Sequence, residues 1–127
     1  MQPLDELIDI VGLDDQQLVK AVSKFYWQSS KQIARERTKL YQLQLKATPR
    51  AIKIERTYQF WGRCTGAGEI TYNYLLSILP MELIDYIVVH ELCHIQHMNH
   101  DRSFWRRVGS VIPNYKSLMK RLEGGDI

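Results

Sequence analysis

The chain has 127 residues, 45% of them hydrophobic, and its 17 Lys and Arg against 14 Asp and Glu leave a formal net charge of +3. This length predicts one domain, spanning 1–127, with a real core. So mild a charge does not indicate a nucleic-acid partner, and no apolar run is long enough to predict a membrane span. The first residues are acidic and lack the pattern of a signal peptide. The two cysteines do not have the spacing of a disulfide framework and fit a reducing compartment, so we expect a cytoplasmic protein.

Residues 1–50 are expected to form a helical lead-in to the rest of the chain. Apolar residues at helical spacing predict a first helix over 4–11. Asp14 or Asp15 can cap a second helix, because a carboxylate there accepts backbone N–H groups that have no partner within the helix. Neither glycine nor proline interrupts the sequence from there to about Gln44, which predicts one long helix.

Two short strands are predicted next, at the start of the motif-bearing part of the chain, 51–123. Residues 51–56 alternate apolar and charged side chains, which is typical of a strand with one buried face. Residues 69–74 form a second candidate strand, and 61–68 is interpreted as the connection between the two. We therefore expect a small antiparallel sheet.

The stretch from Pro80 to about Gln96 predicts a helix whose apolar residues cover most of its circumference, which indicates burial on several sides. It carries His90, Glu91 and His94 in the pattern HExxH. Buried imidazoles and carboxylates are costly unless they are paired or bind a metal. Residues four apart lie on one face of a helix, about 6 Å apart along its axis, so His90 and His94 can bind the same ion.

A third ligand is expected just beyond this helix, where the sequence offers His97 and His100. His97 lies near the helical face of His90 but one turn further along than the metal would be. A chain that turns after His97 brings His100 back to the ion, so we favour His100 over its rival. Three imidazoles with an open fourth position are typical of a catalytic zinc site, and one Zn²⁺ per chain is expected. Glu91 would then take a proton from a water bound to that ion.

The end of the chain is predicted to form short helices. Asp101 is a suitable N-cap for one that forms a wall of the site, and Pro113 can begin another. Basic residues outnumber acidic ones after the histidines, which indicates a solvated helix face more strongly than an anion site. Cys93 does not lie on the helix face that carries His90 and His94, so it is interpreted as a packing residue. Cys64 is expected to be a thiol in the core.

Several stretches of the chain together resemble one protein family. They are FWGRC at 60–64, GEITYN at 68–73, LP at 79–80, IDYIVVHELCH at 84–94, NHDRSFW at 99–105 and IPNY at 112–115. In this order and spacing they resemble the YgjP-like metallopeptidase domain family, zincin-type proteins related in motif to the SprT and WLM families. The resemblance implies a metal held by His90, His94 and His100, with Glu91 as general base. It also implies a strand around Trp61-Gly62 beside the cleft.

The resulting prediction is an α+β, zincin-like fold. In it, a small antiparallel sheet packs against a long N-terminal helix and a buried HExxH helix, with short C-terminal helices. The leading function is zinc-dependent hydrolysis of a peptide by a metallopeptidase, without a nucleic-acid or membrane partner. One alternative is a metal-dependent phosphohydrolase in which Arg63, Arg102 or Arg106 binds the phosphate oxygens of a small anionic substrate, a nucleotide or other phosphoanhydride. Another is a non-catalytic binding module, against which Glu91 and the open metal position argue.

Overall fold

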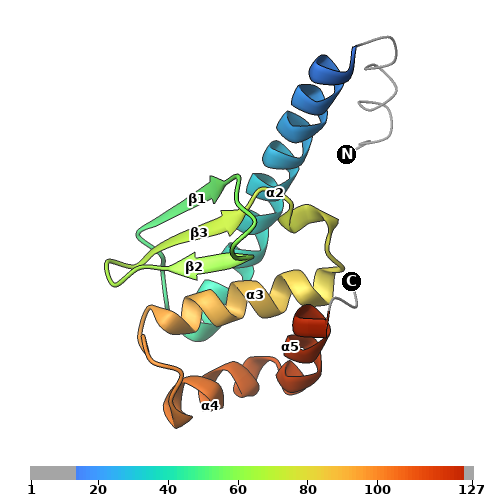
Figure 1. Ribbon diagram of the computed structural model, residues 1–127. Helices are drawn as coiled ribbons and strands as arrows, with labels where there is room; N and C mark the ends of the chain where they lie inside the picture. Colours follow the sequence, from blue (N-terminus) through green and yellow to red (C-terminus); the bar gives the residue numbers. More distant parts are fainter. Residues whose placement is uncertain (1–13, 125–127) are drawn as a thin grey trace.

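The fold is described for residues 14–124 by a computed structural model, which has four α-helices, one 3-10 helix and a three-stranded sheet (Figure 1). The helices are α2 (Asp15–Leu45), α3 (Met81–His94), α4 (Arg102–Val111) and α5 (Tyr115–Gly124), with the short η1 at Leu76–Ile78. The strands are β1 (Ala51–Glu55), β2 (Gly62–Cys64) and β3 (Glu69–Asn73). The predicted α+β class is confirmed, and the helix predicted over 4–11 lies outside the described residues.

The sheet is mixed, so the prediction of an antiparallel sheet is wrong. β1 and β3 are parallel, with Ala51 opposite Glu69 and Glu55 opposite Asn73. The stretch predicted as a plain connection contains β2, which pairs antiparallel with the other side of β3. A parallel pair needs a connection of about a dozen residues or more, and the chain between Glu55 and Glu69 is long enough to supply it. Gly68, with a φ of 81°, closes the β2–β3 turn in a conformation that favours glycine.

β2 is an edge strand, and Figure 1 shows it between β3 and α3. On the side of β2 that pairs with β3, the carbonyl oxygen of Trp61 accepts the Asn73 N–H at 2.9 Å. Because hydrogen-bonded pairs alternate along an antiparallel ladder, Gly62 and Cys64 direct their N–H and C=O groups away from β3. The edge that faces α3 therefore carries free backbone donors and acceptors.

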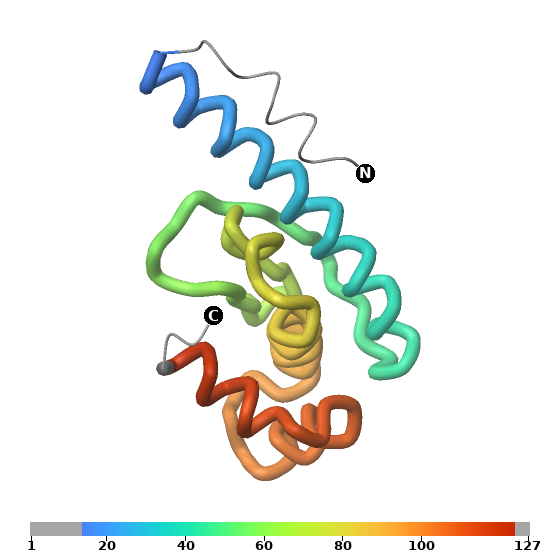
Figure 2. Tube along the Cα trace, turned by 90° about the vertical axis from the view of Figure 1, so that its right-hand side faces the viewer, coloured from blue at the N-terminus to red at the C-terminus, as the bar shows by residue number. Residues whose placement is uncertain are grey.

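The long helix α2 begins at a capping box. The Asp14 carboxylate accepts the Gln17 N–H at 2.8 Å, while the Gln17 side chain accepts the Asp14 N–H at 3.1 Å, which confirms Asp14 as one of the two predicted caps. The N-terminal part of α2 extends beyond the sheet, and its remainder runs beside the sheet and α3 (Figures 1 and 2). Figure 2 shows α4 and α5 on another side of α3, so α3 lies at the centre of the molecule.

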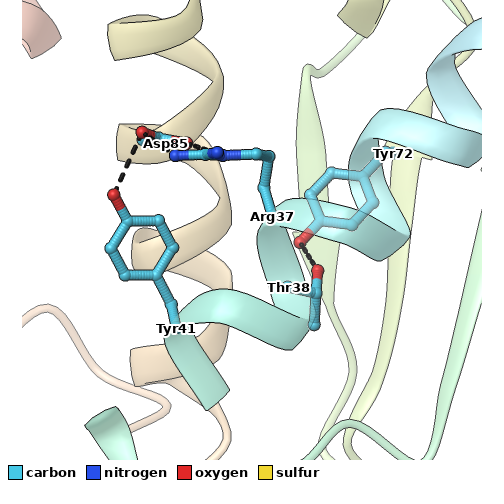
Figure 3. A network of polar contacts seen from close by, with 5 residues as sticks. All are labelled: Arg37, Thr38, Tyr41, Tyr72 and Asp85. Carbon is cyan, nitrogen blue, oxygen red and sulfur yellow. Dashed lines mark hydrogen bonds and ion pairs between the residues drawn. The ribbon is translucent and has the colours of Figure 1, made fainter. Parts of the chain in front are cut away.

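A polar network joins α2 to α3 and to the central strand (Figure 3). The Asp85 carboxylate accepts from Arg37 Nε and Nη2 at 2.7 and 2.9 Å and from the Tyr41 hydroxyl at 3.0 Å. Further along the sheet side of α2, the Thr38 hydroxyl lies 3.5 Å from the hydroxyl of the buried Tyr72. Helix α2 therefore fixes the position of α3, on which the histidines lie.

Asp85→Ala is expected to lower the free energy of unfolding by about 2–3 kcal/mol, because Arg37 and Tyr41 lose their partner at a largely buried interface. The cost stays below that of a fully buried pair because 25% of the Arg37 side chain is exposed. Urea unfolding followed by circular dichroism measures it. Lys53→Ala, which removes an exposed ion pair to Glu69, is the matched control and should cost under about 1 kcal/mol. Equal losses in the two variants would contradict the assigned role.

The hydrophobic core lies where α2, α3, α4 and the inner face of the sheet meet. Leu83, Val88 and Leu92 of α3 are fully buried, which confirms the predicted burial of this helix. Cys93 is also fully buried, as a packing residue should be. Within residues 14–124, none of the helices combines the length and the apolar character that crossing a bilayer would require.

Candidate metal centre

Three histidines converge at the C-terminal end of α3. His90 and His94 lie on successive turns of this helix, and His100 comes from the irregular segment between α3 and α4. One ring nitrogen from each residue lies within 4.8 Å of the others, and Nε2 of His94 is 3.0 Å from Nε2 of His100. The structure thus brings together the three side chains that the sequence predicts as ligands. The rival, His97, lies outside this cluster.

The chain returns to the site because α3 and α4 are separated by a short turn. Helix α3 ends at His94, and the His97 N–H makes one last helical bond to the carbonyl oxygen of Cys93 at 3.0 Å. Helix α4 then starts where the Asp101 carboxylate accepts the Phe104 N–H at 2.9 Å, so the predicted N-cap is confirmed. His100 directly precedes this cap, which places its ring between the two helices.

Hydrogen bonds determine which nitrogen is free in two of the histidines. Nδ1 of His94 lies 3.0 Å from the main-chain carbonyl oxygen of His97, and a carbonyl only accepts, so Nδ1 carries the proton. Nδ1 of His90 lies 3.1 Å from the Glu91 carboxylate, and the same reasoning applies. In both rings Nε2 keeps the lone pair that a metal needs. The contribution of His97 is therefore its main-chain carbonyl, which orients His94.

The surroundings of His94 also favour its neutral form. Burial lowers the pKa of this imidazole, and the neighbouring His90 adds to the effect. A neutral imidazole binds metal, whereas a protonated one does not. Three imidazole nitrogens that converge in this way can hold a divalent transition-metal ion.

Glu91 is buried between α3 and the edge strand β2, with 5% of its surface exposed. A Cβ atom built on Gly62 would lie 3.0 Å from Cγ and 3.1 Å from Oε2 of Glu91, and 3.1 Å from Cγ2 of Ile87. Such distances are too short for ordinary contacts, so glycine is what lets β2 approach α3 here. The sequence offers a signal for this contact, because a glycine within a strand often marks a close approach. Sequence reasoning reached Gly62 only through family resemblance.

Aromatic rings pack against the histidines. The ring centroid of Phe104 is 4.4 Å from that of His94 and 5.1 Å from that of His90. The ring of Tyr86, one turn before His90 on α3, lies edge-on to His90 at 5.8 Å, and burial raises the pKa of its hydroxyl to about 12. Trp105 packs against His100. The predicted wall contributed by α4 is thus present, and such apolar walls strengthen electrostatic interactions inside the site.

Two further side chains of β2 lie on opposite faces of the sheet. Arg63 is exposed, and its guanidinium lies over the Phe60 ring at 4.6 Å. Since side chains alternate along a strand, Arg63 points away from the face on which Gly62 meets Glu91. Cys64 shares that inner face with Gly62 and is half-buried, and burial raises the pKa of its thiol to about 11. The thiol is therefore protonated at neutral pH.

Comparison with known proteins shows the fold and the family of the chain. The crystal structure of the metallopeptidase zymogen of Pyrococcus abyssi abylysin is similar, with a TM-score of 0.66 at 24% identity, covering 72% of this chain and 93% of that one, which shows a shared fold. No curated protein matches the chain. The model of the YgjP-like, metallopeptidase domain family matches residues 4–124, almost the whole chain. The chain therefore belongs to the YgjP-like metallopeptidase domain family, as the resemblance predicted, and with that membership it is a metal-dependent peptidase.

Proposed function

We propose that this protein is a zinc-dependent peptidase in which His90, His94 and His100 bind the ion and Glu91 is the general base. Family membership accounts for a metal and a peptide substrate. The assignment of the three ligands and of the base is supported by one observation, the convergence of three imidazoles beside a buried glutamate.

The donor set fits zinc. Three histidine nitrogens with an open fourth position are a typical ligand set of catalytic zinc. Ligating histidines usually donate their other ring N–H to an oxygen, and His90 and His94 both do so. When bound, zinc would polarise the scissile carbonyl group and lower the pKa of the attacking water.

Glu91 is suited to move the proton that peptide hydrolysis requires. It follows the first histidine directly, and its carboxylate is held between the His90 ring and the backbone of Gly62. From this position it takes a proton from the attacking water and delivers it to the leaving amine. Burial limits the access of bulk water to the carboxylate, which has the His90 Nδ1–H as its hydrogen-bond donor.

The substrate we propose is an extended peptide that adds a strand to β2. Gly62 and Cys64 offer free N–H and C=O groups at the edge facing α3, and such edges bind peptides through main-chain hydrogen bonds. Gly62 also touches Glu91, so the pairing edge lies next to the base. Of the arginines considered for a phosphoanhydride, Arg63 lies on the opposite face of the sheet from this contact, which favours the peptide.

Metal analysis and a paired substrate screen test this function. About one zinc per chain is expected from the three-ligand site, and casein-like peptides should be hydrolysed while nucleoside triphosphates are not. A purified apo-protein without affinity for zinc would overturn the metal centre. Hydrolysis of triphosphates alone would overturn the choice of substrate.

Gly62→Ala is expected to slow peptide hydrolysis roughly 10- to 100-fold, because the added methyl group displaces the Glu91 carboxylate from its productive position. Zinc affinity should stay near the wild-type value, since the contacts of the added Cβ are with Glu91 and Ile87 and not with the histidines. Steady-state kinetics and competition with a chromophoric chelator measure the two quantities.

Gly66→Ala is the matched control, because no atom lies within 4 Å of a Cβ at this position in the β2–β3 turn. It should leave both the rate and the zinc affinity unchanged. If Gly62→Ala hydrolysed peptides as fast as Gly66→Ala, the contact with Glu91 would have no bearing on the reaction.

A further inference from the structure

A stack of three rings links the third histidine to the C-terminal helix. The Trp105 ring lies 5.6 Å from the His100 ring at an interplanar angle of 23°. The Tyr115 ring lies 5.2 Å from Trp105 at an angle of 13°. The stack therefore runs from the α3–α4 turn, through α4, to the first residue of α5.

His100 differs from the other two histidines in how it is held. It is exposed and comes from an irregular segment, whereas His90 and His94 are fixed by helix α3. His94 has a carbonyl oxygen as partner of its Nδ1, and His90 has a carboxylate. Among residues 14–124, the hydrogen-bond contact of the His100 ring is with Nε2 of His94, and no oxygen accepts from it. Its orientation therefore depends on ring packing.

A glycine on α4 leaves room for the stack. Gly109 lies four residues after Trp105, so the two share one face of the helix. A Cβ atom on Gly109 would lie 3.2 Å from Cε1 and 3.5 Å from Cδ1 of Tyr115. Glycine inside a helix is destabilising relative to alanine. Here it lets the Tyr115 ring lie flat against Trp105.

We propose that Trp105 and Tyr115 are positioning residues for His100 and set the affinity of the metal centre. The stack keeps the imidazole turned toward His94, so that the third ligand does not have to be ordered when the ion binds. Tyr115 affects His100 indirectly, by packing against Trp105, and Gly109 does so by leaving room for the Tyr115 ring. This inference rests on the proposed metal centre.

Zinc affinity of the full chain, measured by competition with a chromophoric chelator, tests the proposal without any substrate. Trp105→Leu should weaken zinc binding roughly 10- to 100-fold, the usual effect of losing a group that orients a ligand. Trp105→Phe keeps a flat ring and should restore most of the affinity. Tyr115→Leu and Gly109→Ala should weaken binding several-fold. Trp27→Leu, which changes a tryptophan of α2, is the matched control and should bind as the wild type does.

The outcomes separate this inference from the function on which it rests. A wild-type chain without zinc affinity would overturn the metal centre itself. The stack would not set the zinc affinity if Trp105→Leu bound zinc as tightly as the wild type. The same conclusion would follow if Trp105→Phe bound zinc as weakly as Trp105→Leu. Circular dichroism with a chelator present shows whether each variant folds. If Trp105→Leu did not fold, the zinc affinity of Gly109→Ala would decide, because this variant removes no side chain. An unchanged zinc affinity in Gly109→Ala would then overturn the inference.

Discussion

Glu91→Gln is expected to hydrolyse peptides roughly 10²- to 10⁴-fold more slowly than the wild type, the usual contribution of a general base. Glutamine has the shape of glutamate and fits beside Gly62, but an amide does not take up the proton of the attacking water. Because the three histidines are untouched, zinc content and affinity should remain near wild type. Single-turnover hydrolysis and metal analysis of one preparation measure both.

The matched control for this variant lies on the same helix. Glu82→Gln changes an exposed glutamate in the first turn of α3, where it pairs with Arg121. It should retain full activity. A Glu91→Gln enzyme that worked at the rate of Glu82→Gln would show that another group takes the proton.

His100→Ala and His97→Ala should differ sharply in zinc affinity. Removing His100 takes away one of three ligands, so the loss should exceed the roughly 10- to 100-fold typical of an orienting group. His97→Ala should bind zinc nearly as the wild type does, because the contact of this residue with His94 uses its main-chain carbonyl, which alanine retains. Chelator competition on the two variants measures the difference. The reverse order of affinities would make His97 the third ligand.

The parts of the site that lie on or next to one helix could be predicted from the sequence. HExxH in an apolar stretch places His90 and His94 on one face of a buried helix, and the cap at Asp101 brings the chain back at His100. These features depend on local rules, namely helical periodicity and capping. Local rules hold within a few residues, so these predictions agreed with the structure.

The sheet and the packing around the site depend on contacts between distant residues. β2 spans Gly62–Cys64, which is too short for an alternating pattern, so its pairing with β3 leaves no periodic signal. Periodicity therefore did not reveal β2, which only the family resemblance indicated, and without it β1 and β3 were expected to be antiparallel, whereas they are parallel. The contact of Gly62 with Glu91 and the stacking of Trp105 on His100 depend in the same way on how whole elements pack.

The open edge of β2 has a consequence for which proteins can be cut. A peptide that binds there, as proposed, must offer its own unpaired N–H and C=O groups to Gly62 and Cys64. Segments inside helices or sheets of a folded protein have already used these groups, so they are unable to pair without first unfolding. The proposed peptidase would therefore spare natively folded neighbours and attack flexible termini, exposed linkers or damaged chains.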